Sequence, residues 1–220
     1  MIKAVIFDLD GVLINSEKYL IDLYEEFVKE HHLSLKREDF YIMIGGNRRM
    51  NHMQYVYNLM PECKWNAEEF ERELRAYTAK AKEGFSFKSI VYPEVKDAIE
   101  KLHNDVYKIV CASSSNNEHI NQALSDCEII DYFDIIVSGL DFKESKPNPE
   151  IYNHCVERLG LDKSECVIVE DSPYGIKAAN AAGIYVYVRR DTQFGMDQSG
   201  ADCFIDNLNE MIEDIKNSCS

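Results

Sequence analysis

AVIFDLDGV, residues 4–12, joins a short apolar run to two carboxylates and a glycine. The apolar run predicts a buried β-strand, and the acids follow directly after it. On an extended chain, residues two apart point to the same side, about 7 Å from each other, so Asp8 and Asp10 can face one ligand. A plain turn after the strand uses the same residue types, and further signals along the chain have to separate the two interpretations.

The chain has 220 residues and a formal net charge of -15. This length fits one large domain, or a core with an inserted subdomain. The negative charge argues against a nucleic acid or an anionic membrane as partner. It would also repel a phosphorylated small molecule, so a phosphate site would need a bound cation and a well-placed Lys or Arg.

The sequence contains no run of eighteen apolar residues, and its first residues do not resemble a signal peptide. Its seven cysteines form no C-x-x-C pair, which favours reduced cysteines in the core over disulfides or a zinc site. We therefore expect a cytoplasmic protein without a membrane partner. We expect it to be a monomer or a weak dimer.

Short β-branched runs alternate with amphipathic helical patterns along most of the chain. Continuous apolar strands between helices predict an α/β fold, with a doubly wound, Rossmann-like parallel sheet covered on both faces. The expected strands are residues 3–7, 107–112, 135–138, 166–170 and 184–188.

One interval breaks this alternation with helical patterns only, expected at 17–30, 37–44, 48–59 and 67–82. We predict that residues 16–87 form an inserted all-helical cap that determines substrate specificity, and that 1–15 and 88–220 form the Rossmann-like catalytic core. Ligands of such sheets bind outside the carboxyl ends of the strands, so a cap inserted after the first strand would overhang the site.

Three further signals of the same chemistry follow in order along the chain, at the ends of expected strands. Ser113 ends the second strand, where residues 115–118 have the pattern of a capping box and the start of a helix could bind an anion. Lys146 stands before a proline and a helix start, and would supply positive charge. Glu170 and Asp171 end an apolar strand, and such hard oxygen ligands suit Mg²⁺.

The motifs FDLDGVLINSE, VCASSS, SKPNPEIY and VIVEDSPYGIKAANAAG together resemble the four motifs of the haloacid dehalogenase superfamily. The resemblance is to the branch with a helical cap after the first motif, which includes the β-phosphoglucomutase-like phosphatases. It extends from residue 7 to residue 183, and it is specific for the family but not for the substrate.

The resemblance implies a role for each motif residue. Asp8 resembles the nucleophile and a Mg²⁺ ligand, and Asp10 the general acid/base, whose backbone carbonyl also binds the metal. Ser113 and Ser114 would bind phosphate, and Lys146 would orient the nucleophile and the phosphoryl group. At the last motif, Asp171 matches a metal ligand, while Glu170 either binds the metal directly or supports a ligand.

These features predict a Mg²⁺-dependent phosphatase that hydrolyses a small phosphorylated metabolite, with a sugar phosphate as the expected class, through an aspartyl-phosphate. A sugar phosphomutase is the nearest alternative. The mutases of this branch have a histidine one turn into the first cap helix, where this chain has Leu20, and the difference favours a phosphatase. A phospho-aspartate regulatory module is a more distant alternative, because its usual length is nearer 120 residues.

Several other positions carry weaker expectations. Arg48 or Arg49, after a glycine-containing loop of the cap, could reach a distal group of the substrate, and Asn117 could contact the substrate from a helix start. Glu94 stands where a glycine is usual in the family. Arg189 and Arg190 follow an expected strand and have the pattern of surface charges, with steering of an anion as the alternative.

Overall fold

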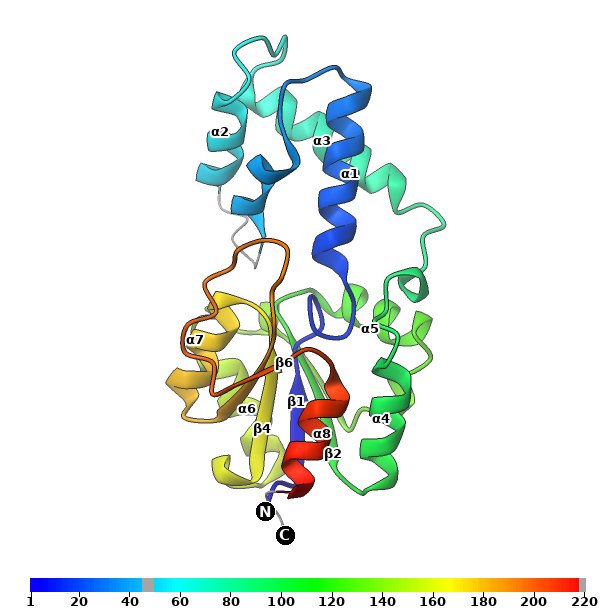
Figure 1. Ribbon diagram of the computed structural model, residues 1–220, viewed down its shortest axis with the longest axis vertical. Helices are drawn as coiled ribbons and strands as arrows, with labels where there is room; N and C mark the ends of the chain where they lie inside the picture. Colours follow the sequence, from blue (N-terminus) through cyan, green and yellow to red (C-terminus); the bar gives the residue numbers. More distant parts are fainter. Residues whose placement is uncertain (45–49, 218–220) are drawn as a thin grey trace. The chain divides into compact units, whose positions relative to one another are not determined.

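The computed structural model describes residues 1–44 and 50–217. Its centre is a six-stranded parallel sheet in the order β3-β2-β1-β4-β5-β6 (Figure 1). The strands are β1 (Ala4–Phe7), β2 (Lys108–Ser113), β3 (Ile135–Ser138), β4 (Cys166–Glu170), β5 (Tyr185–Arg189) and β6 (Cys203–Ile205). The predicted α/β fold with a parallel sheet and a helical insertion between β1 and β2 is confirmed.

The chain divides into two compact units. The first comprises Met1–Asn15, Phe87–Thr192 and Met196–Ser220, and the second comprises Ser16–Ser86 and Gln193–Gly195. Helices of the first unit are α4 (Val95–Asn104), α5 (Asn117–Asp126), α6 (Glu150–Leu159), α7 (Pro173–Ala182) and α8 (Leu208–Asn217). Those of the second are α1 (Ser16–Glu30), α2 (Met50–Asn58) and α3 (Ala67–Ala81).

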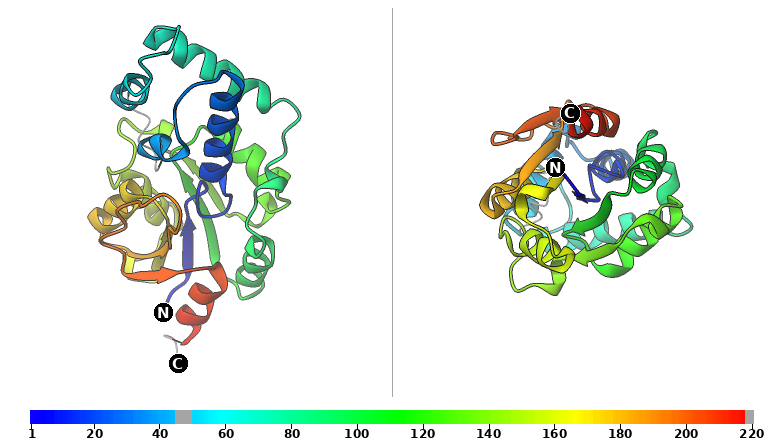
Figure 2. Two further views of the ribbon diagram at one scale, coloured as in Figure 1. Left: turned by 45° about the horizontal axis from the view of Figure 1, so that its top comes forward. Right: turned by 90° about the horizontal axis from the view of Figure 1, so that it is seen from below.

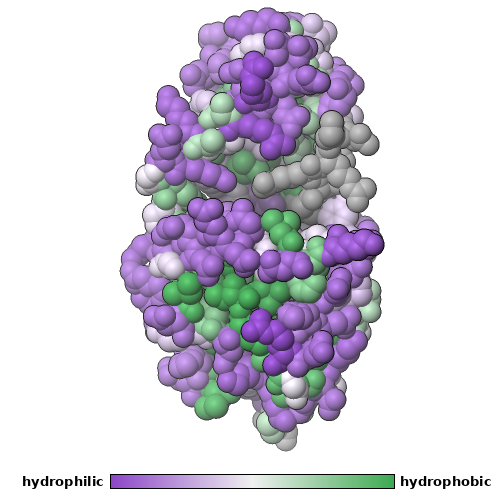
Figure 3. Space-filling model, turned by 180° about the vertical axis from the view of Figure 1, so that it is seen from behind, coloured by the Kyte–Doolittle hydropathy of each residue, from purple (hydrophilic) through white to green (hydrophobic). Residues whose placement is uncertain are grey.

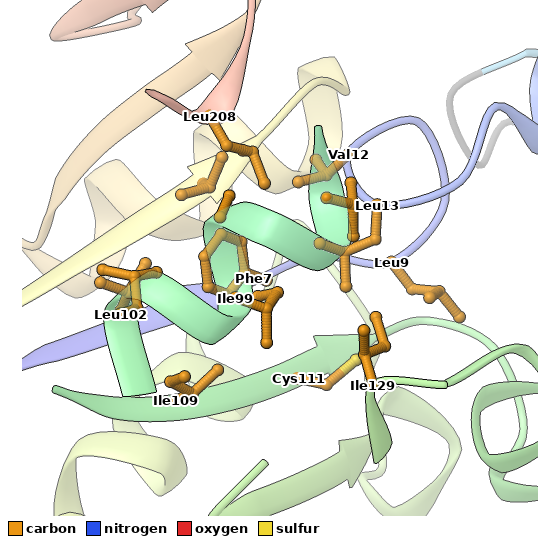
Figure 4. Close-up of a cluster of buried hydrophobic side chains, with 14 of the residues drawn as sticks. Phe7, Leu9, Val12, Leu13, Ile99, Leu102, Ile109, Cys111, Ile129 and Leu208 are labelled. Atoms are coloured by element: carbon orange, nitrogen blue, oxygen red, sulfur yellow. The ribbon is translucent and has the colours of Figure 1, made fainter. Parts of the chain in front are cut away.

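The sheet is buried on both faces, and successive side chains of each strand point alternately into one face and the other. In β1, Val5 and Phe7 join the hydrophobic cluster that contains residues of α4, α5 and α8, whereas Ala4 and Ile6 join the cluster formed with α6 and α7. Figure 4 shows Phe7 against Ile99 of α4. Helices cover both sides of the sheet in Figure 2. This burial explains why the strands read as continuous apolar runs.

The strand order creates a switch point at β1. The chain proceeds from β1 to β2 and β3 on one side, then crosses back to β4, β5 and β6 on the other. In sheets of this kind, ligands bind outside the carboxyl ends of the strands at such a point. Asp8 directly follows β1 and therefore lies at this position.

The second unit is helical and has an aromatic centre. The buried ring of Phe27 lies close to Trp65, Phe70 and Tyr77, with ring centroids 5.9, 6.0 and 5.4 Å away. The segment expected as a helix at 37–44 is a 3-10 helix, Arg37–Met43. The role of this unit in substrate specificity stays a prediction.

The structure corrects the sequence-based expectations at the C-terminal part of the core. It adds β6, which has only three residues and too little pattern to be recognised. Arg189 is not a surface charge, because only 7% of it is exposed. Its Nη2 donates to Glu94 Oε1 at 2.6 Å, and its guanidinium lies 4.0 Å from the centre of the Tyr92 ring. Glu94 thus has a partner that its position in the sequence did not indicate.

The face seen in Figure 3 is mostly hydrophilic, with a hydrophobic patch on the part of the molecule formed by the core. Within residues 1–44 and 50–217, no helix is both long and apolar enough to cross a membrane.

We predict that Glu94→Ala destabilises the protein, because it leaves the buried Arg189 guanidinium without its carboxylate. The expected loss in the free energy of unfolding is about 2–3 kcal/mol, measured by urea denaturation. Arg190→Ala is the matched control, since the Arg190–Asp206 pair is exposed and should contribute less than about 1 kcal/mol. Equal stability of the two variants would contradict the prediction.

Candidate active site

The register of the sheet brings three motifs together at the carboxyl ends of neighbouring strands. Phe7 of β1 pairs with Cys111 of β2 on one side and with Val169 of β4 on the other. The residues that follow these three are Asp8, Ala112 and Glu170, so they lie next to one another across adjacent strands. Neighbouring strands are about 4.8 Å apart, which is close enough for the Asp8 and Glu170 side chains to share a ligand.

Asp8 is held at this edge by its backbone and by one carboxylate oxygen. Its N–H donates to the carbonyl of Val169 at 2.9 Å, and its Oδ1 accepts from Lys146 Nζ at 2.6 Å. Within the described part of the chain, no hydrogen bond to Oδ2 is found. Burial raises the pKa of Asp8 to about 8, since Glu170 and Asp10 add to this effect and Lys146 offsets only part of it. One oxygen of Asp8 is therefore fixed and the other can react.

Lys146 is buried between two carboxylates, with 3% of its side chain exposed. Its ammonium donates to Asp8 Oδ1 at 2.6 Å, to Glu170 Oε1 at 2.7 Å and to the carbonyl of Ala112 at 2.9 Å. A lysine has three donors, so all three are used. Burial alone would lower the pKa of Lys146, but Asp8 and Glu170 outweigh it and raise the pKa well above the usual value. The positive charge is thus permanent and fixed in place.

Glu170 is fully buried, and both of its oxygens accept hydrogen bonds. Oε1 accepts from Lys146 and from Tyr152 Oη at 2.7 Å, while Oε2 accepts from the N–H groups of Asp171 and Ser172 at 3.0 and 3.1 Å. Burial would raise the pKa of Glu170, but these donors lower it overall. A Cβ at Gly175 would lie 1.7 Å from Oε1, so this packing requires a glycine there.

Three buried acids could hold a divalent metal ion. Asp8, Glu170 and Asp171 each offer a carboxylate oxygen, and these atoms all lie within 4.8 Å of one another. Such a donor set fits a hard cation like Mg²⁺. Both oxygens of Glu170 already accept hydrogen bonds from Lys146, Tyr152 and the backbone.

Asp171 depends on a glycine in the first motif and on a distant glutamine. A Cβ on Gly11 would lie 1.9 Å from Asp171 Oδ2, and Gly11 has a φ of 82°, so both space and backbone conformation require glycine. The side chain of Gln198, 8% exposed, donates to the carbonyl of Asp171 at 2.7 Å and to that of Arg189 at 2.8 Å.

Ser113 ends β2 and is buried at the same edge. Its hydroxyl accepts from the N–H of Ser115 at 3.0 Å, and in the described ranges no group accepts its own proton. The hydroxyl can therefore donate to a ligand. Ser114 is exposed, and its Oγ accepts from Ser145 Oγ at 3.1 Å.

The predicted capping box at 115–118 is wrong in its register. Helix α5 begins at Asn117, and its N-cap is Asn116, whose side chain accepts from the N–H of His119 at 2.8 Å. The Ser115 hydroxyl instead donates to Asp10 Oδ2 at 2.9 Å. The sequence pattern missed this contact because it joins residues 105 positions apart.

The structure does not bring the weaker candidates to the group formed by Asp8, Lys146, Glu170 and Asp171. Asn117 is exposed, and its amide nitrogen lies 3.4 Å from both carboxylate oxygens of Asp141. Arg48 and Arg49 lie outside the described residues. Tyr152, which donates to Glu170, and Gln198, which donates to the Asp171 carbonyl, were not expected at the site. Tyr152 is the last residue of the SKPNPEIY motif, but the motif gave it no role, and Gln198 stands in no motif.

The arrangement combines a carboxylate with one reactive oxygen, a fixed ammonium, a buried hydroxyl that can donate and acidic ligands for a cation. Such a combination suits attack on an electrophilic centre that carries negative charge, because the positive charges compensate it.

Comparisons with known proteins agree with this chemistry. The family model described as "Haloacid dehalogenase-like hydrolase" matches residues 5–188. The "Phosphorylated carbohydrates phosphatase" of Thermotoga maritima is 31% identical over 182 residues, which is 83% of this chain and 82% of the relative. A "Phosphoglycolate phosphatase" of Aliivibrio fischeri is 26% identical over 189 residues, covering 84% of this chain and 83% of the relative.

Solved structures show the same fold. The β-phosphoglucomutase of Clostridium difficile aligns with a TM-score of 0.71 at 22% identity, covering 99% of this chain and 96% of the other. The family match over most of the chain, together with the relative that is 31% identical, establishes that the chain belongs to the haloacid dehalogenase-like hydrolase family.

Proposed function

We propose that the protein is a Mg²⁺-dependent phosphatase that hydrolyses a small phosphorylated metabolite through an aspartyl-phosphate on Asp8. One observation carries this proposal. The buried Lys146 holds one oxygen of Asp8 at 2.6 Å, next to the acidic metal-ligand set and the Ser113 hydroxyl, while the other oxygen has no hydrogen bond within the described part of the chain.

In the first half of the reaction, Asp8 Oδ2 attacks the phosphorus atom. A bond forms between this oxygen and phosphorus, and the bond between phosphorus and the ester oxygen breaks. Asp10 gives its proton to the departing oxygen, so the alcohol leaves neutral. Lys146 keeps the attacking carboxylate in one orientation, and Ser113 donates to a phosphoryl oxygen.

In the second half, water attacks the phosphorus of the aspartyl-phosphate. Asp10, now a carboxylate, accepts a proton from the water, and the bond between Asp8 and phosphorus breaks. Inorganic phosphate leaves, and both aspartates return to their starting forms. Proton transfer of this kind contributes about 10² to 10⁴ to the rate, far below the ~10²¹ that hydrolysis of a phosphate monoester can require.

Charge compensation must therefore supply much of the remaining acceleration. Asp8, Asp171 and the Asp10 carbonyl, with Glu170 as a support, are the residues proposed to hold Mg²⁺. When bound, Mg²⁺ would neutralise negative charge on the phosphoryl oxygens. Lys146 adds a positive charge that remains in the site when the ion is lost.

The substrate class rests on the relatives. The Thermotoga maritima relative is named for phosphorylated carbohydrates and the Aliivibrio fischeri relative for phosphoglycolate. We propose a sugar phosphate as the substrate class, with the helical insertion determining which sugar is accepted. Arg48, Arg49 and Asn117 stay candidates for contacts with the distal part of the substrate.

The first test is phosphate release from glucose 6-phosphate, ribose 5-phosphate, 2-phosphoglycolate and β-glucose 1-phosphate with Mg²⁺. We expect at least one to be hydrolysed, and Asp8→Asn to lower the rate on the order of 10³-fold or more, because the nucleophile is lost. Asp131→Asn makes the same chemical change at an exposed residue and should leave the rate unchanged. Activity that persists in Asp8→Asn would refute the nucleophile assignment.

The acceptor of the phosphoryl group separates a phosphatase from a mutase. Leu20 lies in α1, where an imidazole is expected in the mutases, and leucine cannot exchange a proton with a sugar hydroxyl. We predict that β-glucose 1-phosphate is either hydrolysed or left unchanged. Glucose 6-phosphate formed without free phosphate, detected by ³¹P NMR, would instead identify a mutase.

Metal binding should depend on pH, because the pKa of Asp8 in the metal-free protein is about 8. Between its unfolded pKa of about 4 and this value, folded Asp8 keeps a proton that the unfolded chain releases, so metal-free stability falls as pH rises. A cation displaces this proton and binds better at high pH. We expect Mg²⁺ at 100 times its pH 8.5 Kd to raise the Tm by about 5–10 °C at pH 8.5, and the same Mg²⁺ concentration to raise it by less at pH 6, where binding is weaker.

Thermal melting with Mg²⁺ or with EDTA measures this difference. Asp171→Asn should remove most of the Mg²⁺-dependent rise, whereas Asp197→Asn, in an exposed loop, should retain it. A rise of the same size in Asp171→Asn and in the wild type would show that the ion binds elsewhere.

A further inference from the structure

Asp10 is contacted by two side chains from the segment where α5 begins. Ser115 Oγ donates to Asp10 Oδ2 at 2.9 Å, and His119 Nε2 lies 3.5 Å from Asp10 Oδ1. Each side chain thus reaches a different oxygen of the same carboxylate. Two contacts on different oxygens restrict rotation of the carboxylate, which a single contact would leave free.

The backbone of Ser115 is held by hydrogen bonds at both its N–H and its carbonyl. Its N–H donates to Ser113 Oγ at 3.0 Å, and its carbonyl accepts from Ser138 Oγ at 2.7 Å. Ser138 ends β3, so the position of the Ser115 hydroxyl depends on the ends of two neighbouring strands. A hydroxyl can donate to a carboxylate and accept from a carboxylic acid, so it can hold Asp10 in both forms.

His119 is fixed at its backbone and at its ring. Its N–H donates to the N-cap side chain of Asn116 at 2.8 Å, and its ring meets Phe87 edge-on, with centroids 4.9 Å apart. Its Nε2 is a buried atom for which no hydrogen-bond partner is found in the described ranges, and the Asp10 carboxylate lies 3.5 Å away. Catalytic hydrogen bonds are often long in the absence of substrate and shorten in the reacting complex.

We propose that Ser115 and His119 are positioning residues, which hold Asp10 in the orientation from which it protonates the leaving oxygen. This inference rests on the proposed phosphatase function. The alternative is that both side chains only stabilise the loop before α5. The two roles differ in one respect: a positioning role affects the proton transfer, whereas a structural role affects every substrate equally.

Two classes of ester separate these roles. The first is an alkyl phosphate, for which the test takes the fastest substrate of the Mg²⁺ screen above; when its P–O bond breaks, the leaving group is an alkoxide that needs a proton. The second is p-nitrophenyl phosphate, whose leaving group is a stable phenolate that does not need a proton. The value of kcat/KM reports the steps up to departure of the leaving group, so it excludes the later hydrolysis in which Asp10 acts as a base.

We expect Ser115→Ala and His119→Phe each to lower kcat/KM for the alkyl ester by about ten- to a hundredfold, part of the ~10² to 10⁴ of general acid catalysis. For p-nitrophenyl phosphate we expect a loss below about threefold, since no proton is needed. Ser115→Thr and His119→Gln, which keep a donor near the same place, should recover most of the loss.

Controls separate local from general effects. Ser125→Ala changes an exposed serine of α5, the helix that contains His119, and His103→Gln changes a histidine of α4 that does not contact Asp10. Both should leave the two kcat/KM values unchanged. Thermal melting shows whether each variant is folded. His119→Phe retains an aromatic ring against Phe87, so it removes the nitrogen with little change in packing.

The outcomes distinguish this inference from the proposed function. A selective loss on the alkyl ester in Asp10→Asn, but not in Ser115→Ala or His119→Phe, would overturn the positioning role alone. Equal losses on both esters would assign the two residues a structural role. A wild-type protein that releases phosphate from neither ester would overturn the phosphatase proposal and the positioning role with it.

Discussion

The buried ammonium of Lys146 is the contact on which the rest of the site depends. Asp8 and Glu170 lie at the carboxyl ends of adjacent strands, and two carboxylates at that spacing in a buried environment would repel each other. Lys146 donates to both, at 2.6 and 2.7 Å, and its third donor binds the Ala112 carbonyl. Because no donor is left over, in the proposed reaction Lys146 would act on a bound phosphoryl group through the orientation of Asp8 and through its charge.

The parallel register supplies the geometry that this contact needs. Strands β1, β2 and β4 end side by side, so residues separated by more than a hundred positions meet at one edge. Two glycines make room for the acids: Gly11 for the Asp171 carboxylate and Gly175 for that of Glu170. The glycines of the first and last motifs are therefore as much a part of the site as the carboxylates, because any side chain at either position would occupy the space of an acidic one.

One departure from the family pattern has a local explanation in the structure. Glu94, where glycine is usual, forms an ion pair of 2.6 Å with Arg189, which also packs on the ring of Tyr92. The pair connects the end of β5 to the start of α4, and Gln198 links the backbone carbonyl of Arg189 to that of Asp171. The charge at position 94 is thus compensated within the core and does not add to the negative charge of the site.

The sequence alone determined the fold class, the order of the motifs and the identity of the acids, the lysine and the serine at the strand ends. It could do so because buried parallel strands need continuous apolar runs, and because the polar residues directly follow them. Only the tertiary structure decided which side chains meet. Ser115 and His119 reach Asp10 across more than a hundred residues, and Arg189 is buried because Glu94 is opposite it. Such contacts depend on strand register and helix placement, and no local pattern records them.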